Sequence, residues 1–452
     1  MISMSLSSAA RTLGTEYRGK DEVFHGCSTD SRSINSGELF IAIRGERFNG
    51  HDFLEQARQR GATAALVDSL VPISLPLIKV TDTRKALGEL AKCWRENFRI
   101  PLVAITGSNG KTTVKEMLVS ILEQKSEVLA TRGNLNNDIG VPLTLFGMGN
   151  EHAYAIIEMG ANHPGEIKWL SYIAKPTVAV ITQCAPAHLE GFGSVEGVAL
   201  AKSEIFEGLE KHGTAIINAD DNFAGLWKNR VKDIHQLSFG IHHPADITAR
   251  FPDKSDSNKA NIFILKTPAG SIEVTLSLLG IHNIMNALAA AACATALNIE
   301  LETIKKGLEA MKPVKGRLEI KTGINNSRII DDTYNANPAS LLAAVNVLKT
   351  FNGKHWLVLG DMGELGEEGE NLHLKAGEQA KENNVDRLFT TGTLSQFASK
   401  SFGKNSEHFE SIDDMVQRLQ SEISPEITVL IKGSRSMQME RVVSRLEKKS
   451  QC

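Results

Sequence analysis

A short loop at Thr106–Thr113, with the sequence TGSNGKTT, carries the residues best suited to chemistry. It follows an apolar run at 102–106 and precedes an amphipathic stretch at 111–124, so we expect a strand, a tight turn and a helix. In that setting, glycines let backbone N–H groups converge on phosphate oxygens, a lysine reaches the β- and γ-phosphates, and a hydroxyl holds Mg²⁺. The candidate nucleotide-binding residues are Gly107, Ser108, Asn109, Gly110, Lys111, Thr112 and Thr113.

The match to the general phosphate-loop pattern is incomplete, because Ile105 stands where the first glycine of GxxxxGKT would fall. The alternative is a tight strand-to-helix turn with an exposed lysine. Agreement between the strand, the glycine turn and the helix favours the phosphate loop over that alternative.

Further polar side chains follow expected strands, where ligands gather in open α/β sheets. Glu158 ends the apolar run 153–157, and beside a phosphate loop it becomes a candidate Mg²⁺ ligand. His188 follows the strand expected at 178–182, but imidazole suits hard Mg²⁺ poorly, so the residues alone leave its role undecided. Lys202 stands on an expected helix, where a solvated surface charge is the simpler interpretation.

Later segments offer amides, carboxylates and cations in turn-rich settings. Asn283 and Asn286 share a face near a helix N-terminus and could bind a base or ribose, although Asn283 could equally cap the helix. Asp332 ends the strand expected at 328–331 and could face a ribose or metal, or belong to a capped turn. The loop Lys432-Gly433-Ser434-Arg435 suits an anion such as a substrate carboxylate.

The elements that must position these residues alternate along the chain as strands and helices, which predicts right-handed crossovers and a largely parallel α/β sheet. A length of 452 residues suggests three domains at about 150 residues each. We place their boundaries near residues 84 and 312, which gives domains at 1–84, 85–312 and 313–452.

Composition excludes several classes of protein. Lys and Arg number 50 and Asp and Glu 53, a net charge of −3, whereas nucleic-acid partners demand a basic face. The run 287–297 is too short to span a bilayer, and 1–13 lacks the apolar core of a secretory signal. The five cysteines, Cys452 among them, form no CxxC pair, which is typical of reduced cytoplasmic thiols. We therefore expect a cytoplasmic protein without membrane insertion.

Taken in order, these segments resemble the Mur ligases, the ATP-dependent amide-bond-forming enzymes of peptidoglycan assembly. The resemblance covers essentially the whole chain and rests on TGSNGKTT, GNLNNDIGVP (133–142), EMGAN (158–162), AHLEGFGS (187–194), AKSEIF (201–206), GIHNIMNALAAAA (280–292), GRLE (316–319) and DDTYNANP (331–338). The segments STDSR (28–32) and SGELFIAIRGERFNGHDF (36–53) are similar to the uridine-nucleotide domain of part of that family.

The resemblance implies a three-domain α/β enzyme with a central P-loop sheet and a C-terminal Rossmann-like domain. The domains would bind, in order, UDP-N-acetylmuramoyl-tripeptide, ATP and D-Ala-D-Ala, and the peptide carboxylate would be activated as an acyl phosphate. Lys111 would neutralise the γ-phosphate, Thr112 would hold Mg²⁺, and Glu158 and His188 would hold a second Mg²⁺. Lys202 matches a lysine that the family carbamylates.

The resemblance also assigns ligand contacts and leaves rival functions. ATP contacts would come from Asn283, Asn286, Arg317 and Asp332. Substrate contacts would come from Ser28, Asp30, Ser31, Arg32, Gly45, Asn134, Asn136, Asn137, Tyr334, Asn335, Lys432, Ser434 and Arg435, with the asparagine that faces the ligand among 134, 136 and 137 left open. We expect a monomer. The rivals are a sibling amide ligase, including a folylpolyglutamate ligase, and more remotely a P-loop NTPase switch.

Overall fold

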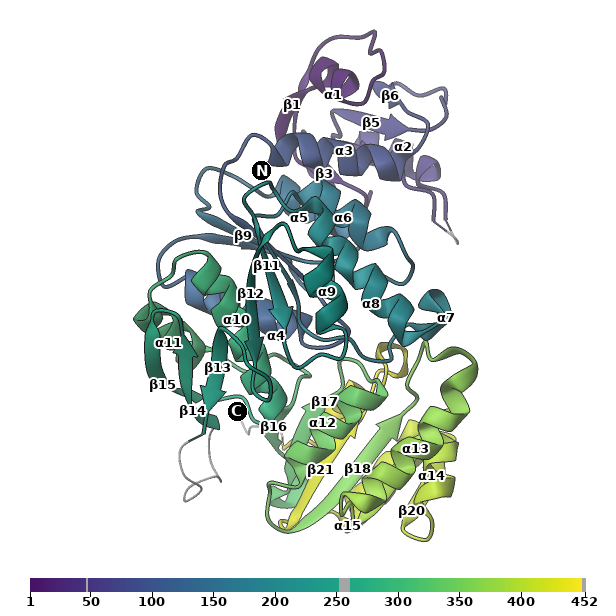
Figure 1. The fold of residues 1–452 in the computed structure, drawn as a ribbon. Coiled ribbons are helices and arrows are strands. Elements are labelled where there is room, and N and C mark those ends of the chain that lie inside the picture. The colour runs from purple at the N-terminus through teal and green to yellow at the C-terminus, as the bar shows by residue number, and fades with distance from the viewer. Residues whose placement is uncertain (46–47, 252–260, 449–452) are drawn as a thin grey trace.

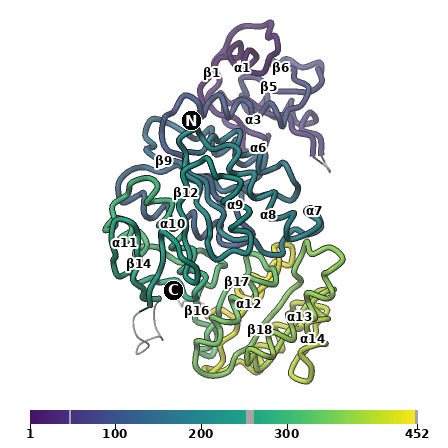
Figure 2. The backbone as a smooth tube through the Cα atoms, in the orientation of Figure 1, coloured from purple at the N-terminus to yellow at the C-terminus, as the bar shows by residue number. Residues whose placement is uncertain are grey.

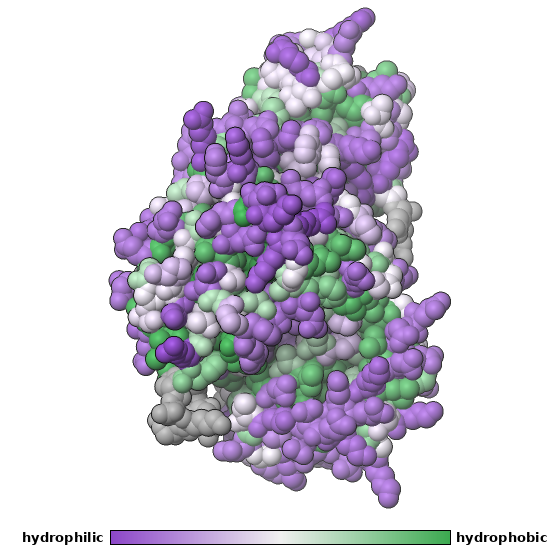
Figure 3. Space-filling view, viewed as in Figure 1, coloured by the Kyte–Doolittle hydropathy of each residue, from purple (hydrophilic) through white to green (hydrophobic). Residues whose placement is uncertain are grey.

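The computed structural model describes residues 1–45, 48–251 and 261–448. Three bodies follow one another along the molecule, with the N-terminal residues at one end and the last strands and helices at the other (Figure 1). The backbone trace shows the same order (Figure 2). The visible face is dominated by hydrophilic residues with hydrophobic residues scattered among them (Figure 3). Among the described residues, no helix combines the length and the apolar character that crossing a membrane requires.

The N-terminal body holds a small parallel sheet and an antiparallel strand pair. The sheet has the order β3-β4-β5-β6, and β1 pairs with β2. The strands are β1 Ser3–Ser5, β2 Val23–His25, β3 Cys27–Ser28, β4 Leu39–Ile41, β5 Ala64–Val67 and β6 Leu77–Lys79. The helices are α1 Leu6–Thr12, η1 Gly50–Phe53, α2 Leu54–Gln59 and α3 Thr83–Arg95. Residues 46–47, inside one of the segments that carry the family resemblance, lie outside the described residues.

The central body is built on a nine-stranded sheet with the order β15-β14-β13-β12-β11-β10-β7-β9-β8. Its strands are β7 Leu102–Thr106, β8 Val128–Ala130, β9 Tyr154–Glu158, β10 Val178–Ile181, β11 Thr214–Asn218, β12 His235–Gly240, β13 Ile247–Arg250, β14 Asn261–Thr267 and β15 Gly270–Leu276. Its helices are α4 Lys111–Leu122, α5 Gly140–Phe146, α6 Glu166–Ala174, α7 Leu189–Phe192, α8 Val195–Ser203, η2 Glu204–Gly208, α9 Ala224–Arg230, α10 Ile281–Ala296 and α11 Leu301–Ala310. Neighbouring strands are parallel except at β13-β14 and β14-β15.

Helices cover both faces of this sheet. Successive residues of a strand point to opposite faces, so the apolar side chains of each strand contribute to a core on either side. On β7, Leu102 and Ala104 join the core beneath α3, α5 and α6, whereas Val103 and Ile105 join the core beneath α4, α10 and α11. The alanines of α10 between residues 287 and 294 are almost fully buried, which lets that helix approach the sheet and α4 closely. The strands therefore present their carboxyl ends, and the loops that follow them, at one edge between two layers of helices.

The C-terminal body has a six-stranded sheet with the order β16-β17-β21-β18-β19-β20, parallel except for β16. Its strands are β16 Glu319–Thr322, β17 Arg328–Asp332, β18 Lys354–Gly360, β19 Arg387–Thr391, β20 Ser406–Phe409 and β21 Ile427–Lys432. Its helices are η3 Ile324–Asn326, α12 Pro338–Leu348, η4 Gly366–Glu368, α13 Gly369–Glu382, α14 Ser395–Phe402, α15 Ile412–Glu422, η5 Arg435–Met437 and α16 Glu440–Leu446.

The predicted fold class, a three-domain α/β chain with mostly parallel sheets, is confirmed. The boundaries near 84 and 312 stay predictions, and the first of them falls within α3, which packs on α5 and α6 of the central body. Cys27, Cys93, Cys184 and Cys293 are free thiols, and Cys452 lies outside the described residues.

Candidate active site

The loop between β7 and α4 takes the compact form that the sequence predicts. Gly107 has φ +152° and Gly110 φ +83°, a region that side chains with a Cβ rarely adopt. A Cβ on Gly107 would collide with the side chain of Thr182, and one on Gly110 would collide with that of Asn286. Both glycines are therefore required by space as well as by backbone conformation.

Hydrogen bonds hold the loop against the residues that directly follow the neighbouring strand β10. Ser108 donates from its backbone N–H to the Gln183 carbonyl at 2.7 Å and from its hydroxyl to the Ala185 carbonyl at 2.9 Å. The Thr182 hydroxyl donates to the Asn109 carbonyl at 2.5 Å. These bonds hold the backbone of the loop in place before any ligand arrives, as a preorganised anion site requires.

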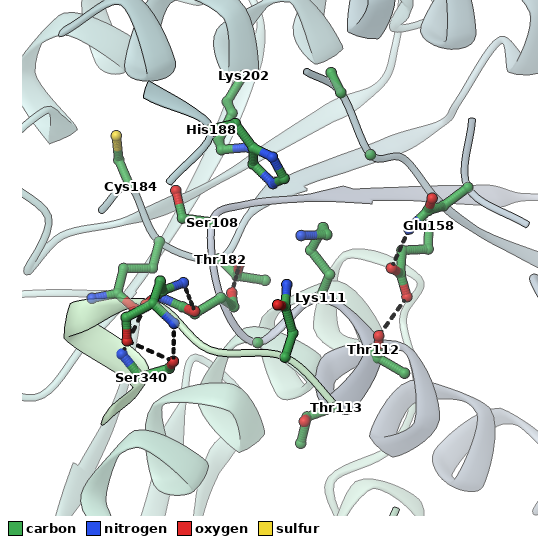
Figure 4. Close-up of a pocket in the computed structure, with 18 of the residues that line it drawn as sticks. Ser108, Lys111, Thr112, Thr113, Glu158, Thr182, Cys184, His188, Lys202 and Ser340 are labelled. Atoms are coloured by element: carbon green, nitrogen blue, oxygen red, sulfur yellow. Dashed lines mark hydrogen bonds between the residues drawn. The ribbon is translucent and has the colours of Figure 1, made fainter. Parts of the chain in front are cut away.

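Lys111 and Thr112 open α4 and face the end of β9. Nζ of Lys111 donates to the Gly107 carbonyl at 2.7 Å, and burial together with nearby Arg317 lowers the lysine pKa. Thr112 Oγ1 donates to Oε2 of Glu158 at 2.9 Å (Figure 4). Asn136 Nδ2 donates to the other carboxylate oxygen at 2.8 Å. The structure thus brings the predicted lysine, hydroxyl and carboxylate together, and of the three candidate asparagines it is Asn136 that contacts Glu158.

These groups suit a hard cation. Glu158 is only 2% exposed, so its carboxylate needs compensating charge, and oxygen atoms are the donors that Mg²⁺ prefers. Among the described residues, no three His, Cys, Asp or Glu side chains gather as a metal cluster. Mg²⁺ commonly takes one or two protein ligands and completes its shell with phosphate oxygens and water, so Thr112 and Glu158 fit such a site.

His188 and Lys202 approach the loop from the segment after β10 (Figure 4). Lys202 is 2% exposed, which corrects the interpretation of a solvated helix charge. Burial, together with the charge of Lys111, lowers the pKa of Lys202 to about 7. His188 Nδ1 lies 2.5 Å from Oε2 of Glu364 in the C-terminal body, and this contact lowers the pKa of Glu364.

The C-terminal body reaches the loop through two side chains. Arg317 donates from Nη2 to Thr112 Oγ1 at 3.1 Å, and its guanidinium stacks over Tyr334 at 4.3 Å. Asn337 donates from Nδ2 to Oδ1 of Asn109 at 2.7 Å. The loop is therefore contacted from the segment after β10 and from the C-terminal body.

Asp332 and Lys432 form a buried pair on neighbouring strands. Lys432, which is 2% exposed, donates to Asp332 Oδ2 at 2.5 Å and to the Asn335 carbonyl at 2.8 Å. The structure thus gives Lys432 partners within the chain and holds the 332–335 turn in place. Exposed Arg435 pairs with Glu440 at 3.0 Å.

Asn283 and Asn286 lie on the first turns of α10, as the spacing predicts. Gly280 caps this helix, so the alternative that Asn283 caps it is wrong. Asn283 donates from Nδ2 to the Leu279 carbonyl at 2.7 Å and accepts from Asn286 at 3.1 Å. Asn286 in turn adjoins Gly110.

A cavity of about 1160 Å³ opens between the bodies and collects most of the predicted residues. Its lining includes Ser108, Asn109, Gly110, Lys111, Thr112, Thr113, Asn134, Asn136, Asn137, Glu158, His188, Lys202, Asn283, Asn286, Arg317, Asp332, Tyr334, Asn335, Lys432 and Arg435. Gly107 and Ser434 are not among the residues that line the cavity. Ser434 is buried, and its backbone N–H donates to the Asp361 carbonyl at 2.9 Å.

The N-terminal candidates do not line this cavity. Asp30 pairs with Arg32 at 2.8 Å, and hydrogen bonds from Arg32 lower the Asp30 pKa to about 2. Ser31 donates to Gln56 at 2.6 Å, and Ser28 donates to the Asp30 carbonyl at 3.1 Å. The fifth candidate, Gly45, donates from its backbone N–H to the Phe48 carbonyl at 2.9 Å.

Sequence reasoning missed three side chains that complete the site: Thr182, Asn337 and Glu364. Thr182 and Asn337 lie in segments that were singled out for other residues. Glu364 follows β18 in a loop, and no local pattern distinguishes it from any surface glutamate. Only the folded arrangement of two domains brings Glu364 to His188.

Comparison with known proteins agrees with this architecture. Residues 23–95, 105–294 and 316–435 match the Mur ligase family catalytic domain, the Mur ligase middle domain and the Mur ligase glutamate ligase domain, respectively. The chain is 45% identical to UDP-N-acetylmuramoyl-tripeptide–D-alanyl-D-alanine ligase of Escherichia coli (strain K12), and 42% identical to the Haemophilus influenzae ligase of the same name, with all of each chain covered.

Solved structures give the same result. MurF from Acinetobacter baumannii superimposes with a TM-score of 0.94 at 36% identity, covering 99% of this chain and 100% of that chain. MurF ligase from Thermotoga maritima in complex with ADP gives 0.84 at 27% identity, covering 93% and 96%. With three matching domains in family order and relatives similar over its full length, the chain belongs to the Mur ligase family.

Proposed function

We propose that this chain joins D-Ala-D-Ala to UDP-N-acetylmuramoyl-tripeptide at the expense of ATP. The observation that carries the proposal is the convergence of the P-loop, buried Glu158 and buried Lys202 on one cavity that the C-terminal body also lines. The full-length relatives cited above bear the name of this ligase. A sibling amide ligase is less well supported, because the full-length relatives cited above share one name.

The reaction brings two anions together, so the site must concentrate positive charge. A carboxylate oxygen of the tripeptide attacks the γ-phosphorus, the bond to ADP breaks, and an acyl phosphate forms. The amine of the dipeptide then attacks the acyl carbon, phosphate leaves with the bonding electrons, and the amine gives up a proton. Lys111 and the loop N–H groups hold the phosphates and oppose their charge.

Thr112 and Glu158 would hold one Mg²⁺, and Glu158 with His188 would hold a second. Such ions neutralise phosphate charge and align the transferring group. Thr112 presents its hydroxyl on the first turn of α4, and Glu158 presents a carboxylate already oriented by Asn136. ATP contacts come from Asn283, Asn286, Arg317 and Asp332.

We infer that Lys202 is carbamylated. An amine with a pKa of about 7 is substantially neutral at physiological pH, and the neutral amine is the form that attacks CO₂. The N–C bond forms as the electrons of one C–O π bond of CO₂ move to oxygen, one proton passes from the nitrogen to solvent, and the neutral amine becomes an anionic carbamate. That change replaces repulsion of Lys111 with attraction and adds a carboxylate near the metal ligands.

The remaining substrate contacts belong to the outer domains. Ser28, Asp30, Ser31, Arg32 and Gly45 would bind the uridine nucleotide, and Tyr334, Asn335, Lys432, Ser434 and Arg435 would lie near the dipeptide. We further infer that a single chain suffices, since one chain supplies every cavity residue described above. Because the reaction consumes ATP, we place it in the cytoplasm.

Phosphate release from ATP tests this function when the tripeptide substrate and D-Ala-D-Ala are each omitted in turn. We expect rapid release only with both present, together with a product heavier by one dipeptide. Release that ignores the dipeptide would point to a P-loop NTPase switch. Release supported instead by a single amino acid or by glutamate would point to a sibling ligase or a folylpolyglutamate ligase.

A further inference from the structure

One side-chain pair joins the central body to the C-terminal body at the edge of the cavity. His188 lies directly before α7, and Glu364 lies in the loop between β18 and η4. His188 Nδ1 and Glu364 Oε2 are 2.5 Å apart. Nδ1 is buried and makes no hydrogen bond of ordinary geometry among the described residues, so this close contact with the Glu364 carboxylate is the polar interaction that the structure gives it. The carboxylate is therefore the group that decides where this imidazole can carry its proton.

The loop that carries Glu364 is anchored on both sides of that residue. Met362 and Leu365 are buried in the core of the C-terminal body, at 0% and 3% exposure. The backbone N–H of Met362 donates to Nε2 of buried His373 at 3.0 Å. Glu364 is 56% exposed, so no burial requirement of its own places it toward His188. The anchored backbone on both sides of Glu364 places this side chain toward His188.

The backbone on each side of the pair is in the left-handed region. His188 has φ +52° and Glu364 φ +60°, where residues other than glycine and asparagine are uncommon. Such conformations persist where the surrounding structure imposes them, and they cluster at functional sites. Two of them facing one another across a domain boundary indicate that both loops are shaped for this contact.

We propose that Glu364 is a positioning residue for the metal ligand His188. By accepting the Nδ1 proton, the carboxylate leaves the lone pair on Nε2, which is the nitrogen then free to bind Mg²⁺. Carboxylates that hold metal-binding histidines in this way fix the tautomer and raise ligand basicity. The inference rests on the proposed role of His188 in holding the second Mg²⁺. It adds that this site is complete only when the C-terminal body is docked.

Glu364 could instead bind the amine of the incoming dipeptide, since it lines the same cavity. The contact with His188 favours the positioning role, because a carboxylate held at 2.5 Å from a ring nitrogen already has a partner. The two roles predict different kinetics. Loss of a positioning residue weakens metal binding, whereas loss of an amine ligand raises the KM for D-Ala-D-Ala.

Mn²⁺ serves as the probe, measured by electron paramagnetic resonance on the full chain with ADP bound. We expect Glu364→Ala to weaken Mn²⁺ binding about 10–100-fold and to reduce the imidazole-nitrogen coupling in spin-echo spectra. Glu364→Gln should lose less Mn²⁺ affinity, because the amide oxygen of the glutamine can still accept the Nδ1 proton. Glutamine also has the size of glutamate, so the fold should be preserved. Glu367→Gln is the matched control, because Glu367 is exposed in the adjoining η4 and this variant should bind Mn²⁺ as wild type does.

The His188→Ala variant tests the metal-binding role of His188 separately from the positioning role of Glu364. If His188→Ala weakens Mn²⁺ binding and both Glu364 variants do not, the positioning role is wrong and the metal role of His188 stands. If His188→Ala also binds Mn²⁺ normally, the second metal site itself is misassigned. A rise in KM for D-Ala-D-Ala with unchanged Mn²⁺ affinity would overturn the positioning role in favour of amine binding.

Discussion

At the scale of single residues, the hydroxyl of Thr112 connects two charged groups from different bodies. It donates to Glu158 and accepts from Arg317. Buried polar networks of this kind gain strength from the low local dielectric, and each member becomes costly to remove. A cation at this hydroxyl would therefore join a network that already links β9, α4 and the C-terminal body.

Lys111→Ala should reduce turnover by about 10²–10³-fold, because it removes one preorganised charge from the transferring phosphate. The fold should survive, since the buried ammonium makes a single hydrogen bond of 2.7 Å to Gly107 and burial already disfavours its charge. Phosphate release gives the rate and circular dichroism the fold. Lys404→Ala, at an exposed position, serves as the control. Turnover like that of wild type would remove the P-loop assignment.

Lys202→Ala should lose most activity and regain part of it when short carboxylic acids are added, because they replace the carbamate anion. In wild type, the carbamate should decline as pH falls below about 7, since protonation of the amine removes its nucleophilic form. Nuclear magnetic resonance of protein equilibrated with ¹³C-labelled CO₂ measures that signal directly. Absence of both the signal and the rescue would contradict the carbamate.

At the scale of elements, α12 is both a structural cap and a contact to the nucleotide loop. Asn337 and Ser340 form a capping box, and Pro338 occupies the first helical position. The same Asn337 donates from Nδ2 to Asn109. One side chain therefore uses its oxygen to begin a helix and its nitrogen to reach another domain.

Asn337→Ala should destabilise the C-terminal body by about 1 kcal/mol through loss of the cap. Asn337→Asp keeps the oxygen that accepts from Ser340 but lacks the amide that donates to Asn109. We therefore expect Asn337→Asp to unfold in urea like wild type and to bind ATP more weakly. Equal unfolding curves for Asn337→Ala and wild type would show that the cap contributes nothing.

The loop at 106–113 could be predicted from sequence because its whole signal is local: apolar run, glycines, lysine and hydroxyls within eight residues. The burial of Lys202 could not, because a lysine on a helix gives no sign of which layer covers it. The ion pair of Lys432 with Asp332 could not be predicted either, because the two residues are remote in sequence and meet only through the pairing of β17 with β21. Sequence therefore identified the central and C-terminal loops that line the cavity but not the contacts between domains.

At the scale of the whole molecule, the cavity lies between bodies that are each built on a separate sheet. ATP on the central body must meet an amine held by the C-terminal body, which implies closure. The neighbourhoods of Thr83 and Pro313 are the connections about which the outer bodies would turn.

Small-angle scattering should show a smaller radius of gyration when ATP analogue, tripeptide substrate and D-Ala-D-Ala are all present than when none is. Nucleotide alone should give part of the change, because Arg317 and Asn337 contact the P-loop. Lys111→Ala, which should bind nucleotide poorly, provides the control. Identical scattering curves with and without ligands would rule out closure.

The contacts of Arg317 and Asn337 with the P-loop also bear on how the products leave. A nucleotide bound at this loop would leave only after both hydrogen bonds break. Departure of ADP would then be tied to retraction of the C-terminal body, and the same movement would uncover the lengthened peptide. In such an arrangement, turnover would slow in viscous solvent even when the chemical steps are unchanged.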